Sequence, residues 1–130
     1  MANRWFNQFR FSLEKKVVDL FLKVNIGSSG APTVARGLGV ASVVGGTGAS
    51  STGVYTITLQ DKYNALLNAN ITLFKASGAP SAPQSWVVSE DVAGAKTIVI
   101  TTAAAGTATA PASGEVILVK LSLSNTSLNP

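Results

Sequence analysis

Residues 53–59, Gly-Val-Tyr-Thr-Ile-Thr-Leu, are the sequence feature that most restricts the fold. Their side chains alternate, so that Tyr55, Ile57 and Leu59 would share one face of an extended strand. Most of these residues are β-branched or aromatic, which favours a strand over a helix. An apolar run at residues 40–44 and then a Gly- and Ser-rich segment precede them. This pattern predicts a β-hairpin with a long loop.

The same alternation recurs elsewhere and predicts a mainly β fold with a single core. Two further rows of inward-facing side chains are expected, one at Leu20, Leu22, Val24 and Ile26 and one at Ile117, Val119, Leu121 and Leu123. Further strands are expected at residues 70–74, 86–88 and 96–101, joined by loops at residues 76–85 and 102–114.

A capping Asp followed by good helix formers predicts one short helix over residues 61–67. The fold class is therefore an antiparallel β-sandwich or barrel of about seven or eight strands, with one short helix and an N-terminal arm. We expect an arm over residues 1–16, a β domain over residues 17–123 and a polar tail over residues 124–130.

The composition argues against catalysis. The 130 residues include no histidine and no cysteine, which removes the commonest general base, the commonest metal ligand and all thiolate chemistry. Among the six carboxylates, Glu90 and Asp91 are adjacent, and two adjacent side chains of a strand point to opposite faces. We therefore expect no enzyme activity, no cofactor and no metal site, with Glu90 and Asp91 in a solvated turn.

The net charge of +4 is concentrated at the N-terminal end. Residues 1–36 hold six Lys and Arg residues against two acidic residues, whereas the four cations and four acids of residues 37–130 cancel. Such an asymmetry favours contact with an acidic partner.

Residues 1–16 crowd aromatic side chains between arginines. Trp5, Phe9 and Leu13 would form one stripe of a helix, whereas Phe9, Phe11 and Leu13 would alternate in a strand. The segment could bind a partner as an arm or fold onto the domain's own core. We carry the arm hypothesis forward, because Trp and Arg are common interface anchors. The candidate partner-binding residues are Arg4, Trp5, Phe6, Phe9, Arg10 and Phe11.

Several phrases of the sequence resemble those of small virion structural proteins of tailed bacteriophages. They lie at residues 24–33 (VNIGSSGAPT), 53–67 (GVYTITLQDKYNALL), 88–92 (VSEDV) and 114–118 (GEVIL), and the opening MANRWFNQF is similar to that group as well. In order and spacing, the resemblance extends over residues 17–123. It implies a non-enzymatic structural protein of the capsid decoration (cement) type, which binds and stabilises the head shell.

The resemblance also implies partners and a location. The partners would be the major capsid protein or other virion proteins, together with further copies of the chain in a dimer or trimer, and neither nucleic acid nor membrane. Residues 1–16 lack the apolar segment of a signal peptide, and no apolar run approaches the ~20 residues that span a membrane. We therefore expect synthesis in the host cytoplasm and incorporation into the virion capsid.

Two alternatives stay open from the sequence. The chain could be a tail or fibre component of the same kind of particle. It could instead be a carbohydrate-binding β-sandwich that acts through Trp86, Tyr55 or Tyr63, which would require those aromatic side chains to be exposed beside polar groups.

Overall fold

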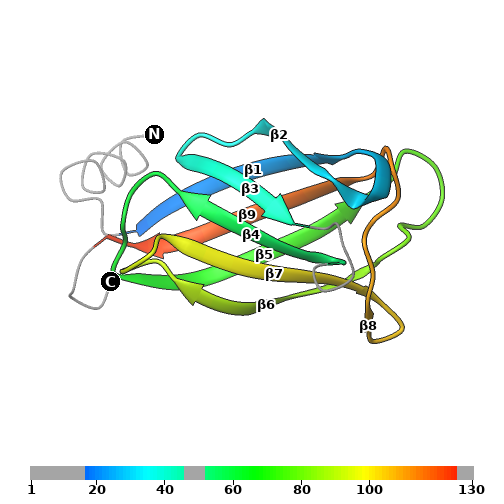
Figure 1. The fold of residues 1–130 in the computed structure, drawn as a ribbon. Coiled ribbons are helices and arrows are strands. Elements are labelled where there is room, and N and C mark those ends of the chain that lie inside the picture. The colour runs from blue at the N-terminus through cyan, green and yellow to red at the C-terminus, as the bar shows by residue number, and fades with distance from the viewer. Residues whose placement is uncertain (1–16, 46–51, 126–130) are drawn as a thin grey trace, which may run out of the picture.

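Two antiparallel β-sheets packed face to face form the domain (Figure 1). The computed structural model describes residues 17–45 and 52–125. The first sheet has the strand order β2 (Pro32–Arg36), β1 (Val17–Ile26), β9 (Val116–Ser124) and β5 (Ala65–Phe74). The second has the order β3 (Val40–Gly45), β4 (Val54–Leu59), β7 (Thr97–Ala104) and β6 (Gln84–Asp91), and the short β8 (Thr107–Ala108) pairs with the end of β7. The predicted antiparallel sandwich is confirmed.

The core lies between the two sheets and is built from alternate side chains of the strands. All three predicted rows are buried and belong to one hydrophobic cluster: Leu20, Leu22, Val24 and Ile26; Tyr55, Ile57 and Leu59; Ile117, Val119, Leu121 and Leu123. Burial alternates along β1 and β4 because successive side chains of a strand point to opposite faces. The prediction of a single core is confirmed.

The predicted hairpin is present as the pair β3 and β4. Val43 lies opposite Ile57, and Gly45 lies opposite Tyr55. Gly45 has a φ of +117°, and a Cβ atom at this position would lie 2.2 Å from the carbonyl oxygen of Val54. Only glycine fits there without strain. Residues 46–51 of the predicted loop lie outside the described residues.

The short helix predicted over residues 61–67 is wrong. The chain bends at Asp61, and the ten-residue strand β5 begins at Ala65. The amides of Tyr63 and Asn64 donate to the carbonyl oxygens of Val92 and Ser124 at 3.0 and 2.9 Å, so the backbone is already paired with other segments before β5 starts. Pairing with neighbouring strands therefore overrides the local helix propensity. The helical element in the described residues is a 3-10 turn at Ser28–Gly30.

Strands also extend into segments that the sequence predicts as loops. β7 continues to Ala104 and is followed by β8, within the loop expected at residues 102–114. β6 begins at Gln84, inside the loop expected at residues 76–85. At the C-terminal end, the sequence predicts Ser124 as the first residue of the tail, whereas in the structure it is the buried last residue of β9.

Candidate functional site

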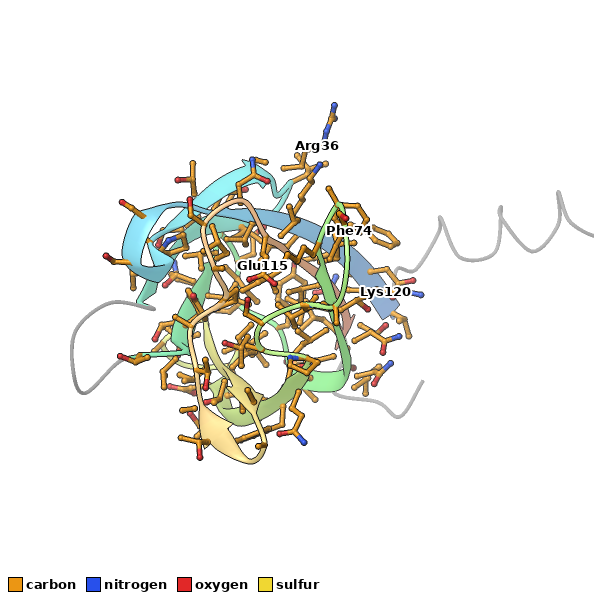
Figure 2. All side chains as sticks on the ribbon, turned by 90° about the vertical axis from the view of Figure 1, so that its right-hand side faces the viewer. Arg36, Phe74, Glu115 and Lys120 are labelled. Atoms are coloured by element: carbon orange, nitrogen blue, oxygen red, sulfur yellow. The ribbon has the colours of Figure 1, made fainter. Side chains whose placement is uncertain are left out.

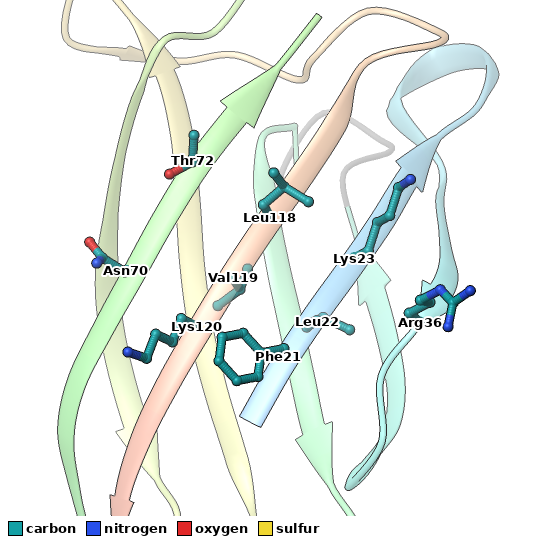
Figure 3. Close-up of a pocket in the computed structure, with 9 residues that line it drawn as sticks. All are labelled: Phe21, Leu22, Lys23, Arg36, Asn70, Thr72, Leu118, Val119 and Lys120. Carbon is teal, nitrogen blue, oxygen red and sulfur yellow. The ribbon is translucent and has the colours of Figure 1, made fainter. Parts of the chain in front are cut away.

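The outer face of the four-stranded sheet carries a hollow lined by cationic and apolar side chains (Figure 3). Its volume is about 370 Å³, and it crosses β1, β9 and β5 and reaches β2. We call it the cationic groove. Its outward-facing lining side chains are Phe21, Lys23, Arg36, Asn70, Thr72, Leu118 and Lys120.

Strand register brings these residues together from distant parts of the sequence. Lys120 of β9 lies between Phe21 of β1 and Asn70 of β5. One step along the sheet, Leu118 of β9 lies beside Lys23 of β1, and Lys23 lies opposite Arg36 of β2. The inward-facing neighbours of these residues form the core, so the same alternation that builds the core presents this row to solvent.

Within the part of the chain that the structure describes, the cations of the groove have no acidic partner. No carboxylate lines it, and among the described residues neither Lys23, Arg36 nor Lys120 forms an ion pair. Asp19, the acidic residue of β1 nearest in register, accepts a hydrogen bond from the Ser122 hydroxyl at 2.7 Å. Like charges directly opposite on neighbouring strands destabilise a sheet, so the pair formed by Lys23 and Arg36 does not serve the fold.

Apolar side chains lie beside these charges. Phe21 is 66% exposed, and the Nζ atom of Lys120 lies 5.8 Å from the centroid of its ring, within the range of a cation–π interaction. Leu118 in the groove and Phe74 at the end of β5 are exposed as well, and Figure 2 shows Phe74 and Lys120 on the same outer side. A surface that combines exposed aromatic and uncompensated cationic groups is suited to bind an acidic protein surface.

The predicted arm residues lie outside the described residues, so their interactions stay a prediction. They are Arg4, Trp5, Phe6, Phe9, Arg10 and Phe11. In the sequence the arm leads directly into β1, the strand that contributes Phe21 and Lys23 to the groove.

The sequence patterns do not predict the groove, although the sequence contains one signal of it. Residues 19, 21, 23 and 25 alternate with the core row of β1, and this alternation places a large aromatic side chain, Phe21, between Asp19 and Lys23 on the solvent side of the strand. The contributions of Arg36, Asn70 and Lys120 depend on strand order, which the sequence does not display.

Of the three aromatic residues considered for sugar binding, two are buried. Tyr55 and Tyr63 belong to the core, and the Tyr55 hydroxyl donates to the carbonyl oxygen of Gly30 at 2.9 Å. Burial raises the pKa of Tyr55 to about 12. Trp86 on β6 is 44% exposed and is therefore a surface residue rather than part of the core.

Glu90 and Asp91 stabilise a local turn. A Glu90 carboxylate oxygen accepts a bond from the amide of Val92 at 3.1 Å, and the Asp91 carboxylate accepts bonds from the amides of Gly94 and Ala95 at 3.1 and 2.9 Å. Both residues are exposed, as predicted for a solvated turn. Over residues 17–45 and 52–125, no group of three or more His, Cys, Asp or Glu side chains is arranged to hold a metal ion.

The described part of the chain contains no helix that is long and apolar enough to span a membrane. Comparison of the chain with models of known protein families, with curated protein sequences and with solved structures gave no match.

Proposed function

We propose that this protein is a structural component of a tailed-bacteriophage virion, of the capsid decoration type, and that it binds an acidic surface of the head shell through the cationic groove. The resemblance of residues 17–123 to such proteins supports the virion assignment. The observation that carries the binding assignment is the uncompensated pair of Lys23 and Arg36, which lie directly opposite each other beside exposed Phe21. Their repulsion is relieved when a carboxylate-bearing partner covers the groove.

A decoration protein requires a rigid scaffold and a contact surface rather than reactive groups. A shell repeats the same acidic site many times, so a modest affinity at each site combines with contacts between neighbouring copies to give firm attachment. The two packed sheets provide the scaffold, and the groove provides a charged, partly apolar surface on one outer face.

Replacing Lys23 with glutamate should weaken shell binding while leaving the domain at least as stable as the wild type. The new carboxylate would lie opposite Arg36 and replace a repulsive pair with an attractive one, which adds about 0.5 kcal/mol to the free energy of unfolding. The same carboxylate would repel an acidic partner, and we expect the dissociation constant to rise by about tenfold or more. Binding is measured by co-sedimentation with head shells purified from a phage mutant that lacks this chain, and stability by thermal unfolding.

The matched control is Lys62→Glu, which makes the same charge change at an exposed position outside the groove. It should bind shells like the wild type. Equal loss of binding in both variants would show that only net charge matters, and would contradict a role for the groove. Absence of the chain from purified wild-type particles would contradict the virion assignment itself.

Deleting residues 2–11 should leave the β domain folded but greatly weaken shell binding. The arm carries Arg4 and Arg10 among aromatic side chains and precedes the strand that contributes Phe21 to the groove. Arm and groove have the same sign of charge, so both would contact one acidic surface and their contributions would combine. High salt should weaken the charged part of this contact but not the burial of the aromatic side chains. A truncated chain that melts far below the wild type would instead place the arm in the domain's own core.

A further inference from the structure

We propose that a second copy of this chain pairs with the open edge of β5, so that two four-stranded sheets join into one continuous sheet. This inference concerns self-association and does not depend on what the cationic groove binds. It rests on the backbone of β5, on the residues along that strand and on the neighbouring side of the sandwich.

The backbone of β5 offers unpaired groups to a partner strand. The carbonyl oxygen of Ile71 accepts a bond from the Ser85 hydroxyl of β6 at 3.4 Å, so it points away from β9. In an antiparallel pair the bonded and non-bonded residues alternate, and therefore Ala69 and Leu73 also direct their N–H and C=O groups to the open edge. In the described residues, the Ser85 bond is the one hydrogen bond made to these outward groups.

The pairing on the far side of β9 supports this assignment. The Ile26 amide donates to the carbonyl oxygen of Glu115 at 2.9 Å, so the carbonyl group of Glu115 faces β1. Every second residue of a strand directs its backbone groups to the same side, so the N–H and C=O groups of Val119, four residues after Glu115, also face β1. They therefore point away from Ile71, the residue of β5 that lies opposite Val119. The backbone groups of Ile71 are consequently left without a β9 partner.

β5 lacks the features that protect edge strands from pairing. Its ten residues include no charge and no proline, and its one register shift lies between Leu66 and Asn68, which leaves residues 69–74 regular. The edge strand β3 of the other sheet also lacks charge and proline, but it has only six residues and contains a register shift between Val40 and Ser42. The two remaining edges carry charge or proline. β2 is short and contains Pro32 and Arg36, whereas β6 carries Glu90 and Asp91.

A second copy is the partner that fits this edge best. Two identical β5 strands related by a two-fold axis run antiparallel and match in length, and neither contributes a charge that would repel the other. β5 and β6 lie on the same side of the sandwich, away from β2 (Figure 1), and there they expose Leu67, Phe74, Trp86 and Val88. Association of two copies would cover apolar side chains as well as pair the backbone.

The test is sedimentation equilibrium of the full chain over a range of concentrations, with Ala69→Pro as the key variant. Proline at residue 69 removes an N–H that points to the open edge, so no hydrogen bond to β9 is lost. We expect a wild-type dimer whose dissociation constant rises at least about tenfold in this variant, because bonds across the new strand pair are lost.

The matched control is Val34→Pro at the opposite edge of the sheet. The Gly27 amide donates to the carbonyl oxygen of Ala31, and bonded and non-bonded pairs alternate, so the pair Asn25 and Thr33 is also a bonded one. The next pair, Val24 and Val34, is non-bonded, and the Val34 N–H therefore faces away from β1.

A second variant keeps the test decisive if Ala69→Pro fails to fold. Asn68→Lys places a charge on the exposed edge strand of each copy without removing any backbone group, and the dimer should weaken in a salt-dependent manner. A wild type that is monomeric at every concentration would overturn the proposal. So would a dimer that persists in both folded β5 variants, or one that Val34→Pro weakens equally. A chain that dimerises only after deletion of residues 2–11 would show that its own arm covers the edge, and would overturn the proposal as well.

Discussion

Replacing Ile57 with aspartate should unfold the domain. Ile57 is fully buried in β4, opposite Val43 of β3 and Ile98 of β7, so the new carboxylate would have apolar neighbours on both sides. Loss of the isoleucine alone costs about 2–5 kcal/mol, and burial of an unpaired charge adds several more. The total is comparable with the whole stability of a domain of this size, about 5–15 kcal/mol.

Thr56→Asp is the matched control for this prediction. Thr56 is the preceding residue of β4, and its side chain points to the outer face of the same sheet. The variant should express as a folded protein with a cooperative thermal transition, whereas Ile57→Asp should show no such transition by circular dichroism. Similar melting temperatures for Ile57→Asp and the wild type would contradict the assignment of this row to the core.

The core could be predicted because its information is local. Apart from Phe21 and Leu118, large apolar side chains alternate with polar or small ones along most of β1, β4 and β9, and a strand with one face buried produces that period. The hairpin of β3 and β4 was predictable for the same reason, since two such runs are joined by a glycine-rich segment.

The helix prediction failed because residues 61–67 are locally ambiguous. Ala65, Leu66 and Leu67 have high helix propensity, but that preference amounts to only a few tenths of a kcal/mol per residue. Pairing of β5 with β9 along its length bonds the backbone groups of β5 that face β9, and it places Ile71 and Leu73 against the core. The partner strand lies some fifty residues further along the chain, so no local pattern could reveal it.

The end of β7 was missed for a different reason. Thr101, Thr102 and Ala103 are buried, but they are too small to give the apolar alternation that marks a strand. The Thr102 hydroxyl donates to the carbonyl oxygen of Thr109 at 2.7 Å, which satisfies it inside the protein. A Thr- and Ala-rich sequence therefore looks like a loop even where it forms a packed strand.

The cationic groove could not be predicted because it is a property of register. Lys23 and Arg36 lie close in sequence, but their direct opposition depends on a register shift between Lys23 and Val24. Lys120 reaches Phe21 only because β9 lies beside β1 in the sheet. Charge counting does predict an acidic partner, and both Lys23 and Arg36 belong to the basic N-terminal part.

Glu115 connects two loops at one end of the sandwich. Figure 2 views the molecule from this end and shows Glu115 between the sheets. Its side chain is 1% exposed, and its two carboxylate oxygens accept hydrogen bonds from the amide of Ser81 at 2.7 Å and from the amide of Ala112. Burial raises the pKa of the Glu115 carboxyl, but these hydrogen bonds and the charge of Lys75 outweigh that effect, so the pKa lies below its ordinary value of 4.5.

This lowered pKa makes part of the stability depend on pH. In the unfolded chain the carboxyl titrates at its ordinary value, and in the folded chain it titrates lower. Its stabilising contribution is therefore complete above the unfolded pKa and is lost as the pH falls through the folded pKa. A protonated carboxyl has one oxygen that carries a proton, and that oxygen is a poorer acceptor for one of the two amides.

Glu115→Gln should accordingly destabilise the domain at neutral pH but not in acid. The glutamine side chain keeps one acceptor oxygen and directs an NH₂ group at the second amide, which leaves a partly buried N–H without its acceptor and costs about 1–3 kcal/mol. The melting temperature at pH 7 should fall by about 5–10 °C. As the pH drops, the wild type loses the same acceptor by protonation, so the melting temperatures of the two proteins should converge.

Glu90→Gln is the control, because Glu90 is exposed and accepts one local bond, and this variant should have little effect at either pH. A constant difference between Glu115→Gln and the wild type from pH 7 to strong acid would contradict this account, because the Glu115 charge would then not be the source of the stabilisation.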